Sequence, residues 1–298
     1  MLDKKLKPTV IALGYFDSVH KGHQKVIATA LEYARANECT LTVFTFGGNL
    51  KAALSGQDDR SVFLPKEREQ MLKNLGADDI YFAPVDKAFL SLSKKRFLKK
   101  MNKTYNIKCY VSGRDYRFGK KGEGDVDFLS KWAKAKKQDQ IVVEDFIVDN
   151  KKVSTTEIKE LLTNGEIEKA NALLGREYSI TGTVFRDRSV GTVLGFPTLN
   201  MRIDNAKHQL KEGVYLGKFI DNGVEYKAVI NYGGRPTFEE NARLIEAHLL
   251  DFKGDLYGKT VTLMFTSYLR DIVKFDGVEQ LKEQLAIDMK NAREGKND

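Results

Sequence analysis

Two histidines, His20 and His23, lie one helical turn apart, with Gly22 between them and Gly14 shortly before them. Two imidazole N–H groups at this spacing can contact one phosphoryl group and stabilise the charge that develops during in-line displacement. The glycines let the backbone approach a phosphate closely. An isolated pair of this kind can also be a helix cap and a surface residue. A zinc site is a weaker interpretation, because no third ligand accompanies the pair at the usual spacing.

A second set of residues able to do chemistry lies in the other half of the chain. Thr198 and Asn200 follow Pro197, and a threonine hydroxyl and an asparagine amide oxygen are hard ligands suited to Mg²⁺. Glu246 and His248 alternate with apolar residues, so both are expected on the polar face of one strand. For the Pro-Thr segment, the alternative is simply a turn that leads into a strand.

The elements that would position the histidines alternate between strand and helix patterns. An apolar run at residues 10–13 ends at Gly14, as a buried parallel strand would, and apolar residues then recur at helical spacing. The carboxyl end of such a strand and the N-terminus of the next helix form the usual anion site of an open α/β sheet. We therefore predict a doubly wound, Rossmann-like domain with a parallel sheet. Its further strands are expected near 41–46, 80–82 and 109–111, and its helices near 65, 94–103 and 127–137.

The second half has a different texture, with short strand patterns separated by Gly, Asn and Asp turns. This favours a β-barrel or sandwich that carries one C-terminal helix near 278–292. Two short helices, 155–162 and 166–174, are expected to close the first domain. The predicted domains are therefore 1–176 and 177–298. The strands of the second are expected at 178–184, 213–220, 224–230, 244–250 and 260–268.

Composition limits the class of protein but not its partner. The 298 residues suffice for two globular domains, and a formal charge of +8 favours anionic partners such as nucleic acid, an acidic membrane or phosphorylated small molecules. Cys39 and Cys109 are isolated, which favours a reducing compartment. Because the sequence shows neither a signal-peptide core nor a membrane-length apolar stretch, a cytoplasmic location is expected.

Taken in order, the motifs of the first half resemble those of the prokaryotic bifunctional riboflavin kinase/FAD synthetase family. The segment from Gly14 to His23 is similar to its HxGH nucleotidyltransferase motif, and residues 113–119 to its nucleotide-contacting loop. Residues 153–159 are similar to its serine/threonine-rich helix start, although Ser154 and Glu157 also make a capping box. The resemblance implies that His20 and His23 are catalytic. It implies nucleotide or phosphate binding for Gly14, Phe16, Asp17, Gly22, Gly113, Arg117, Ser154, Thr155 and Lys159.

The second half resembles the kinase domain of the same family. Residues 195–200, Gly-Phe-Pro-Thr-Leu-Asn, are similar to the flavokinase signature, and residues 231–238 and 245–258 are similar to two further blocks. The resemblance implies that Thr198 and Asn200 hold Mg-ATP, with Gly195 and Pro197 in the nucleotide-binding turn. It also implies that Glu246 is the base that accepts a proton from the riboflavin 5′-hydroxyl.

Three departures from the family pattern stand out. Where the family carries Pro-His-Pro, this chain has Gly47-Gly48-Asn49-Leu50. The family's late arginine is Lys159, which keeps the charge but loses the planar fork of the guanidinium. The arginine common after Gly191 is Thr192.

The expected function is therefore a two-step, Mg²⁺-dependent enzyme. The barrel would convert riboflavin and ATP to FMN, and the α/β domain would convert FMN and ATP to FAD, with no nucleic acid or membrane involved. One alternative is a monofunctional riboflavin kinase whose first domain has lost adenylyl transfer. Another is a basic nucleic-acid-binding or flavin-responsive regulator, which would leave the acid–base and phosphate motifs without a purpose.

Overall fold

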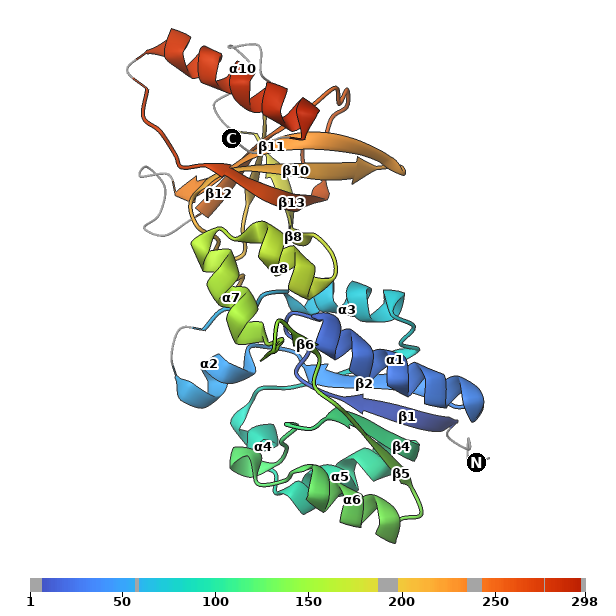
Figure 1. Cartoon of the computed structure of the whole chain (residues 1–298). Helices are drawn as coiled ribbons and strands as arrows, with labels where there is room; N and C mark the ends of the chain where they lie inside the picture. The colour runs from blue at the N-terminus through green and yellow to red at the C-terminus, as the bar shows by residue number, and fades with distance from the viewer. Residues whose placement is uncertain (1–6, 57–58, 187–197, 235–242, 276, 296–298) are drawn as a thin grey trace. The chain divides into compact units, whose positions relative to one another are not determined.

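The computed structural model describes residues 7–56, 59–186, 198–234, 243–275 and 277–295, and divides into two compact units (Figure 1). The first unit is Met1–Thr155 and the second is Thr156–Asp298. One contains a parallel sheet with helices, and the other contains a closed barrel. The fold class predicted from the sequence is confirmed.

The parallel sheet of the first unit is centred on the apolar run that opens the chain. Its strands are β1 (Pro8–Leu13), β2 (Thr40–Phe46), β3 (Asp79–Ala83), β4 (Asn106–Gly113) and β5 (Asp139–Val143). They lie in the order β3-β2-β1-β4-β5, so the loops that follow β1, β4 and β5 leave neighbouring carboxyl ends. These loops are where an open α/β sheet binds its ligands.

Helices cover both faces of this sheet (Figure 1). The helices are α1 (Lys21–Ala36), α2 (Leu50–Ser55), α3 (Pro65–Asn74), α4 (Lys87–Leu90), α5 (Lys94–Thr104) and α6 (Val126–Ala135), with a 3-10 turn at Lys120–Gly122. Val10 and Ala12 pack in one core with residues of α1, whereas Ile11 and Leu13 pack in another with residues of α5 and α6. Burial on both faces explains why β1 is continuously apolar.

A two-stranded hairpin follows β5. It consists of β6 (Ile147–Val148) and β7 (Lys151–Lys152), joined by Asp149 and Asn150. Both turn residues have positive φ, 49° and 60°, which is the requirement of the tight type I′ turn. Asn and Asp tolerate this conformation better than most residues.

The second unit is a closed antiparallel barrel with strand order β10-β11-β12-β9-β8-β13. Alternate residues of each strand face the interior, and Ile230, Tyr232, Ile245 and Ala247 are fully or almost fully buried there. The strands are β8 (Tyr178–Phe185), β9 (Leu199–Arg202), β10 (Gly213–Asp221), β11 (Val224–Gly234), β12 (Arg243–Leu249) and β13 (Thr260–Arg270).

Two helices that were expected to close the first domain instead pack within the second unit. They are α7 (Thr155–Asn164) and α8 (Ile167–Leu174). The amide of Asn171 donates to the carbonyl of Phe265 at 2.9 Å and accepts from the Tyr178 N–H at 2.7 Å. The Lys211 N–H donates to the Leu162 carbonyl at 3.1 Å. The compact units therefore divide after Thr155, earlier than the boundary predicted after residue 176.

The C-terminal helix α10 (Val278–Glu294) docks on the outside of the barrel against β11. Its Asp288 is buried and accepts two hydrogen bonds from Arg270, at 2.9 Å from Nε and 2.6 Å from Nη2. Gln284 adds a third at 2.9 Å. This bidentate pair gives Arg270, for which the sequence suggested no role, a clear one in anchoring the helix.

Candidate active sites

The loop between β1 and α1 is held in an unusual conformation by buried side chains. Phe16 and Val19 are both buried with φ of 50° and 45°, in the left-handed region that a β-branched residue rarely adopts. A Cβ at Gly14 would lie 2.6 Å from the Phe16 ring, so only glycine lets this ring fold back on the strand end. The surrounding packing thus fixes a strained loop, as functional loops often require.

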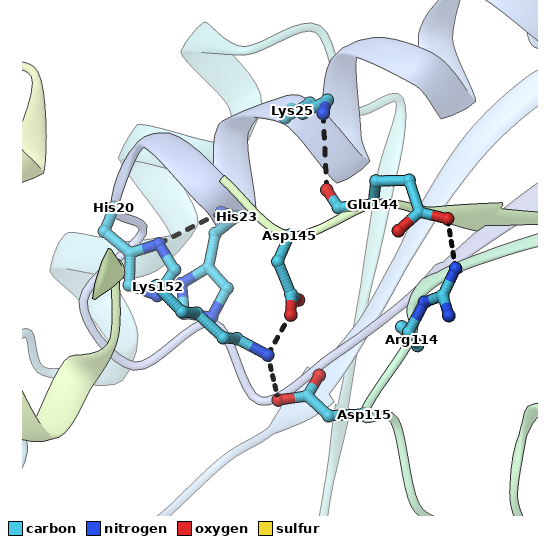
Figure 2. Close-up of polar contacts among 8 residues, drawn as sticks. All are labelled: His20, His23, Lys25, Arg114, Asp115, Glu144, Asp145 and Lys152. Atoms are coloured by element: carbon cyan, nitrogen blue, oxygen red, sulfur yellow. Dashed lines mark hydrogen bonds and ion pairs between the residues drawn. The ribbon is translucent and has the colours of Figure 1, made fainter. Parts of the chain in front are cut away.

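The two histidines of this loop lie against each other at the start of α1. His20 is the N-cap residue, and its Nδ1 accepts the His23 N–H at 3.2 Å (Figure 2). The rings are stacked with centroids 3.6 Å apart, and the Phe16 ring packs edge-on against His23. Because Nδ1 of His20 is an acceptor here, its neutral ring carries the proton on Nε2. A Cβ at Gly22 would lie 3.0 Å from His20 Cε1, so glycine leaves room for this arrangement.

Asp17 and a residue not singled out in the sequence, Arg68, brace the same loop. Asp17 is buried, and its carboxylate accepts the Val62 N–H at 3.4 Å. Arg68 is fully buried and donates to the carbonyls of Tyr15 at 3.1 Å and Phe46 at 2.7 Å. Burial lowers the pKa of its guanidinium, while the nearby Asp17 acts in the opposite direction. The arginine thus ties together the carboxyl ends of β1 and β2.

Charged residues from the loops after β4 and β5 gather beside the histidines (Figure 2). Lys152 Nζ lies 2.7 Å from an Asp115 carboxylate oxygen and 2.8 Å from one of Asp145. Arg114 pairs with Glu144. The predicted nucleotide-contacting loop at 113–119 is therefore brought to this edge, where Gly113 is the last residue of β4.

The serine/threonine-rich helix start also reaches the histidine loop. The Thr155 hydroxyl lies 2.9 Å from that of Ser18, and Ser154 immediately precedes it. Lys159, one turn further, is buried in α7 within the second unit, where its carbonyl accepts from Thr163 at 2.9 Å and lies 3.0 Å from the His208 ring nitrogen. Its predicted role toward phosphate stays a prediction.

A cavity of about 180 Å³ opens in the first unit between α2, α4, α5 and the 113–119 loop. Its walls are aromatic, and the Arg117 side chain lies at its rim and pairs with Asp125 at 3.2 Å. Leu50, from the segment that departs from the family pattern, also lines it. The aromatic side chains are Phe44, Phe46, Phe89, Phe97, Tyr116 and Phe118.

The barrel aligns three polar residues across adjacent strands. Asn231 of β11 is in register with Glu246 of β12, and Glu246 is in register with Asn200 of β9. Residues directly opposite in an antiparallel sheet share a face, so the three side chains form one row on the outer face, away from the buried Ile245 and Ala247. The amide oxygens of Asn200 and Asn231 are buried and have no hydrogen-bond partner in the described chain.

Thr198 lines a cavity of about 210 Å³, whose walls also include Ala247, Asp255 and Tyr257. Gly195, Pro197 and Thr192 lie outside the described residues. A buried amide oxygen that lacks a donor, as in Asn200, fits a hard cation such as Mg²⁺, which takes oxygen ligands. In the described ranges, no group of three or more His, Cys, Asp or Glu side chains is arranged to hold a metal.

Family models match both units. One described as FAD synthetase covers residues 2–157, and one described as riboflavin kinase covers residues 174–295. A Bacillus subtilis protein named bifunctional riboflavin kinase/FMN adenylyltransferase is 34% identical over 98% of this chain and 94% of its own length. A Listeria monocytogenes protein of the same name is also 34% identical, over 95% and 91%.

A solved structure shares the whole architecture. It is named a macrolide-efflux protein from Streptococcus pneumoniae, is 31% identical to this chain, and covers 97% of this chain and 95% of its own with a TM-score of 0.86. Within the part of the present chain that the structure describes, no helix combines the length and apolar character needed to cross a bilayer.

Proposed function

Because the chain belongs to the bifunctional riboflavin kinase/FMN adenylyltransferase family, we propose that it makes FMN in its second unit and FAD in its first. It is an ATP-dependent transferase. What supports the proposal is that each unit carries its own cluster of residues suited to phosphate transfer. One is the stacked histidine pair at the start of α1, and the other is the in-register row that contains Glu246.

In the barrel, the Glu246 carboxylate accepts the proton of the riboflavin 5′-hydroxyl as that oxygen attacks the γ-phosphorus of ATP. The bond between the γ-phosphorus and the bridging oxygen breaks, and ADP leaves. Thr198 and Asn200 would hold Mg²⁺, which when bound neutralises charge on the β- and γ-phosphates. Gly195 and Pro197 would shape the nucleotide-binding turn.

In the α/β unit, a phosphate oxygen of FMN attacks the α-phosphorus of ATP, and pyrophosphate leaves. The N–H groups of His20 and His23 stabilise the negative charge that develops on the α-phosphate. Because this step needs alignment and charge stabilisation rather than a covalent nucleophile, histidines fixed by stacking and capping suit it. Gly14, Phe16, Asp17 and Gly22 would shape the loop around the phosphate, together with Gly113, Arg117, Ser154 and Thr155.

The aromatic cavity of the first unit would take the flavin ring of FMN. Its walls present several aromatic faces and edges, which favour stacking with a flat, fused ring system. Arg117 at its rim would lie near the phosphate end of the ligand. The departure at Gly47-Gly48-Asn49-Leu50 is accommodated locally, since the Asn49 side chain caps α2 by accepting the Ala52 N–H at 2.9 Å.

The positive charge of the chain suits its anionic substrates, so neither nucleic acid nor a membrane is needed to explain it. Cys39 and Cys109 are both free thiols. We place the enzyme in the cytoplasm, where thiols stay reduced.

A single time course tests the proposal. Purified protein is incubated with riboflavin and Mg-ATP, and the flavins are separated at intervals; FMN should appear first and FAD later. Chelation of the metal should stop both steps, and added Mg²⁺ should restore them. FMN without FAD would establish a monofunctional kinase, the alternative suggested by residues 47–50 and Lys159. Absence of both products would overturn the proposed function.

A further inference from the structure

One lysine of the β6–β7 hairpin connects two loops of the first unit. Lys152 is the last residue of the β6–β7 hairpin, and its ammonium bridges Asp115, in the loop after β4, and Asp145, in the loop after β5. All three side chains remain partly exposed, with Lys152 at 39%. The sequence gives no hint of this cluster, because Asp115 and Lys152 are 37 positions apart.

The loop after β5, which carries Asp145, lies against the start of α1. A Cβ at Gly22 would lie 3.4 Å from Cβ of Phe146, the residue after Asp145, and Lys25 of α1 donates to the Glu144 carbonyl at 3.3 Å. Figure 2 shows the Lys152 side chain pointing toward the two aspartates, in the same close-up as His20 and His23. The charged loop after β5 therefore lies close to the N-terminus of α1, where we propose that phosphate binds.

At this edge of the sheet, Lys152 is the cation that pairs with two carboxylates. Arg114 pairs with Glu144, whereas Asp115 and Asp145 both pair with Lys152. The reaction brings together FMN and ATP, which are both multiply negative. Two carboxylates without a cation would repel these ligands, and the repulsion between charges a few ångströms apart is felt even near the surface.

We propose that Lys152 is a positioning residue for adenylyl transfer. Its ammonium neutralises Asp115 and Asp145, so that the phosphates of FMN and ATP can bind beside the histidines. The inference rests on the proposed function of the first unit. It assigns the lysine an effect on ligand binding and not on the chemical step. It also gives the hairpin a purpose, since the hairpin delivers the ammonium to the loops.

The first experiment uses Lys152→Met in the full chain. With FMN and ATP as substrates, we expect KM for each to rise about tenfold, while kcat changes far less. A factor of this order is expected because the unpaired carboxylates of Asp115 and Asp145 would repel a multiply negative ligand through solvent. Lys152→Arg, which keeps the charge, should stay close to the parent. FMN formation from riboflavin should be unchanged and serves as an internal control for folding.

The second experiment tests the mechanism by rescue. Asp115→Asn with Asp145→Asn in the Lys152→Met background removes the unbalanced charges, and KM should return to within about threefold of the parent. Lys73→Met is the matched control, because Lys73 also pairs with a carboxylate, that of Glu69, but near the far end of α3. It should leave FAD formation unchanged.

The KM and kcat values of these variants decide whether Lys152 acts by neutralising the two aspartates. Parental KM values in Lys152→Met would overturn the inference, as would a triple variant as impaired as the single one, because the lysine would then act by direct contact. A kcat loss with unchanged KM would also overturn it. A parent enzyme that makes FMN but no FAD would overturn adenylyl transfer itself, a result that is distinct because it precedes any substitution.

Discussion

The two sites are built in opposite ways. In the barrel, Asn200, Glu246 and Asn231 are set side by side by backbone register, since each lies on a strand hydrogen-bonded to the next. In the α/β unit, the histidine pair lies on a loop in which Phe16 and Val19 have positive φ, and ion pairs through Lys152 join the loops that follow β4 and β5. One geometry follows from the sheet, whereas the other follows from many side-chain contacts.

This difference predicts how each site tolerates change. A residue in the barrel row can lose its own chemistry without displacing its neighbours, because the strands hold the spacing. A residue in the loop site holds others in place, so its effects should spread to binding and to the conformation of the loop.

The largest effect on activity is expected at Glu246, the proposed general base of the barrel. Glu246→Gln keeps the shape but removes the proton acceptor, and FMN formation should fall by about 10³-fold, within the range for general bases. Circular dichroism should show an unchanged barrel, and FAD formation from added FMN should continue at the parental rate. Residual kinase activity within tenfold of the parent would exclude Glu246 as the base.

The second largest effect on activity is expected at the histidine pair. His20→Ala combined with His23→Ala removes both N–H donors, and FAD formation from FMN should fall by about 10²- to 10³-fold. FMN formation, measured in the same preparation, should be largely intact. If both activities disappear from folded protein, the two sites do not work independently.

The anchor of α10 should matter for stability rather than for chemistry. Asp288→Asn leaves Arg270 without its carboxylate partner, and because Arg270 is partly exposed we expect a loss of about 2 kcal/mol in the unfolding free energy of the second unit. Chemical denaturation monitored by far-UV circular dichroism measures this loss. Arg293, also on α10, pairs with the exposed Asp251, which lies just after β12. Arg293→Met should cost under about 0.5 kcal/mol.

The smallest effect concerns Gly22 and separates stability from activity. The higher helix propensity of alanine favours α1 by up to about 0.5–1 kcal/mol, but contact of its Cβ with the His20 ring opposes this gain, so the net change in stability should be small. The new Cβ must nevertheless push the His20 ring by a few tenths of an ångström, so FAD formation should fall about tenfold. Gly277→Ala, where a Cβ meets open space, is the control. Unchanged FAD formation in Gly22→Ala would show that the ring position is not critical.

Much of the fold could be predicted because period and turn chemistry are local signals. The apolar run at 10–13 became β1, and the C-terminal helix expected at 278–292 was found at Val278–Glu294. β9 was foreseen only as the strand into which the Pro-Thr turn would lead, since its four residues carry no alternation long enough to recognise. The hairpin β6–β7 was missed for the same reason. The domain assignment of α7 and α8 depends on packing against distant strands, which periodicity cannot report.

The sites were predictable only in part. His20, His23 and Glu246 stand in motifs, and the Glu246 face followed from alternation. Three features had no local signal, because their partners are far apart in the chain: the Lys152 bridge, the buried Arg68 and the Arg270–Asp288 pair. The register that places Asn231 beside Glu246 likewise depends on how the strands pair.

Barrel closure also bears on self-association. The barrel in the described chain is closed, so every strand has a neighbour on each side and none lies at an open sheet edge that could recruit a strand from another molecule. The open sheet of the first unit does have outer strands, β3 and β5. Both are only five residues long and begin with an exposed aspartate, Asp79 and Asp139. Short, charged edge strands discourage edge-to-edge pairing. The second unit therefore avoids strand pairing between molecules by closing its sheet, and the first unit by the length and charge of its edge strands.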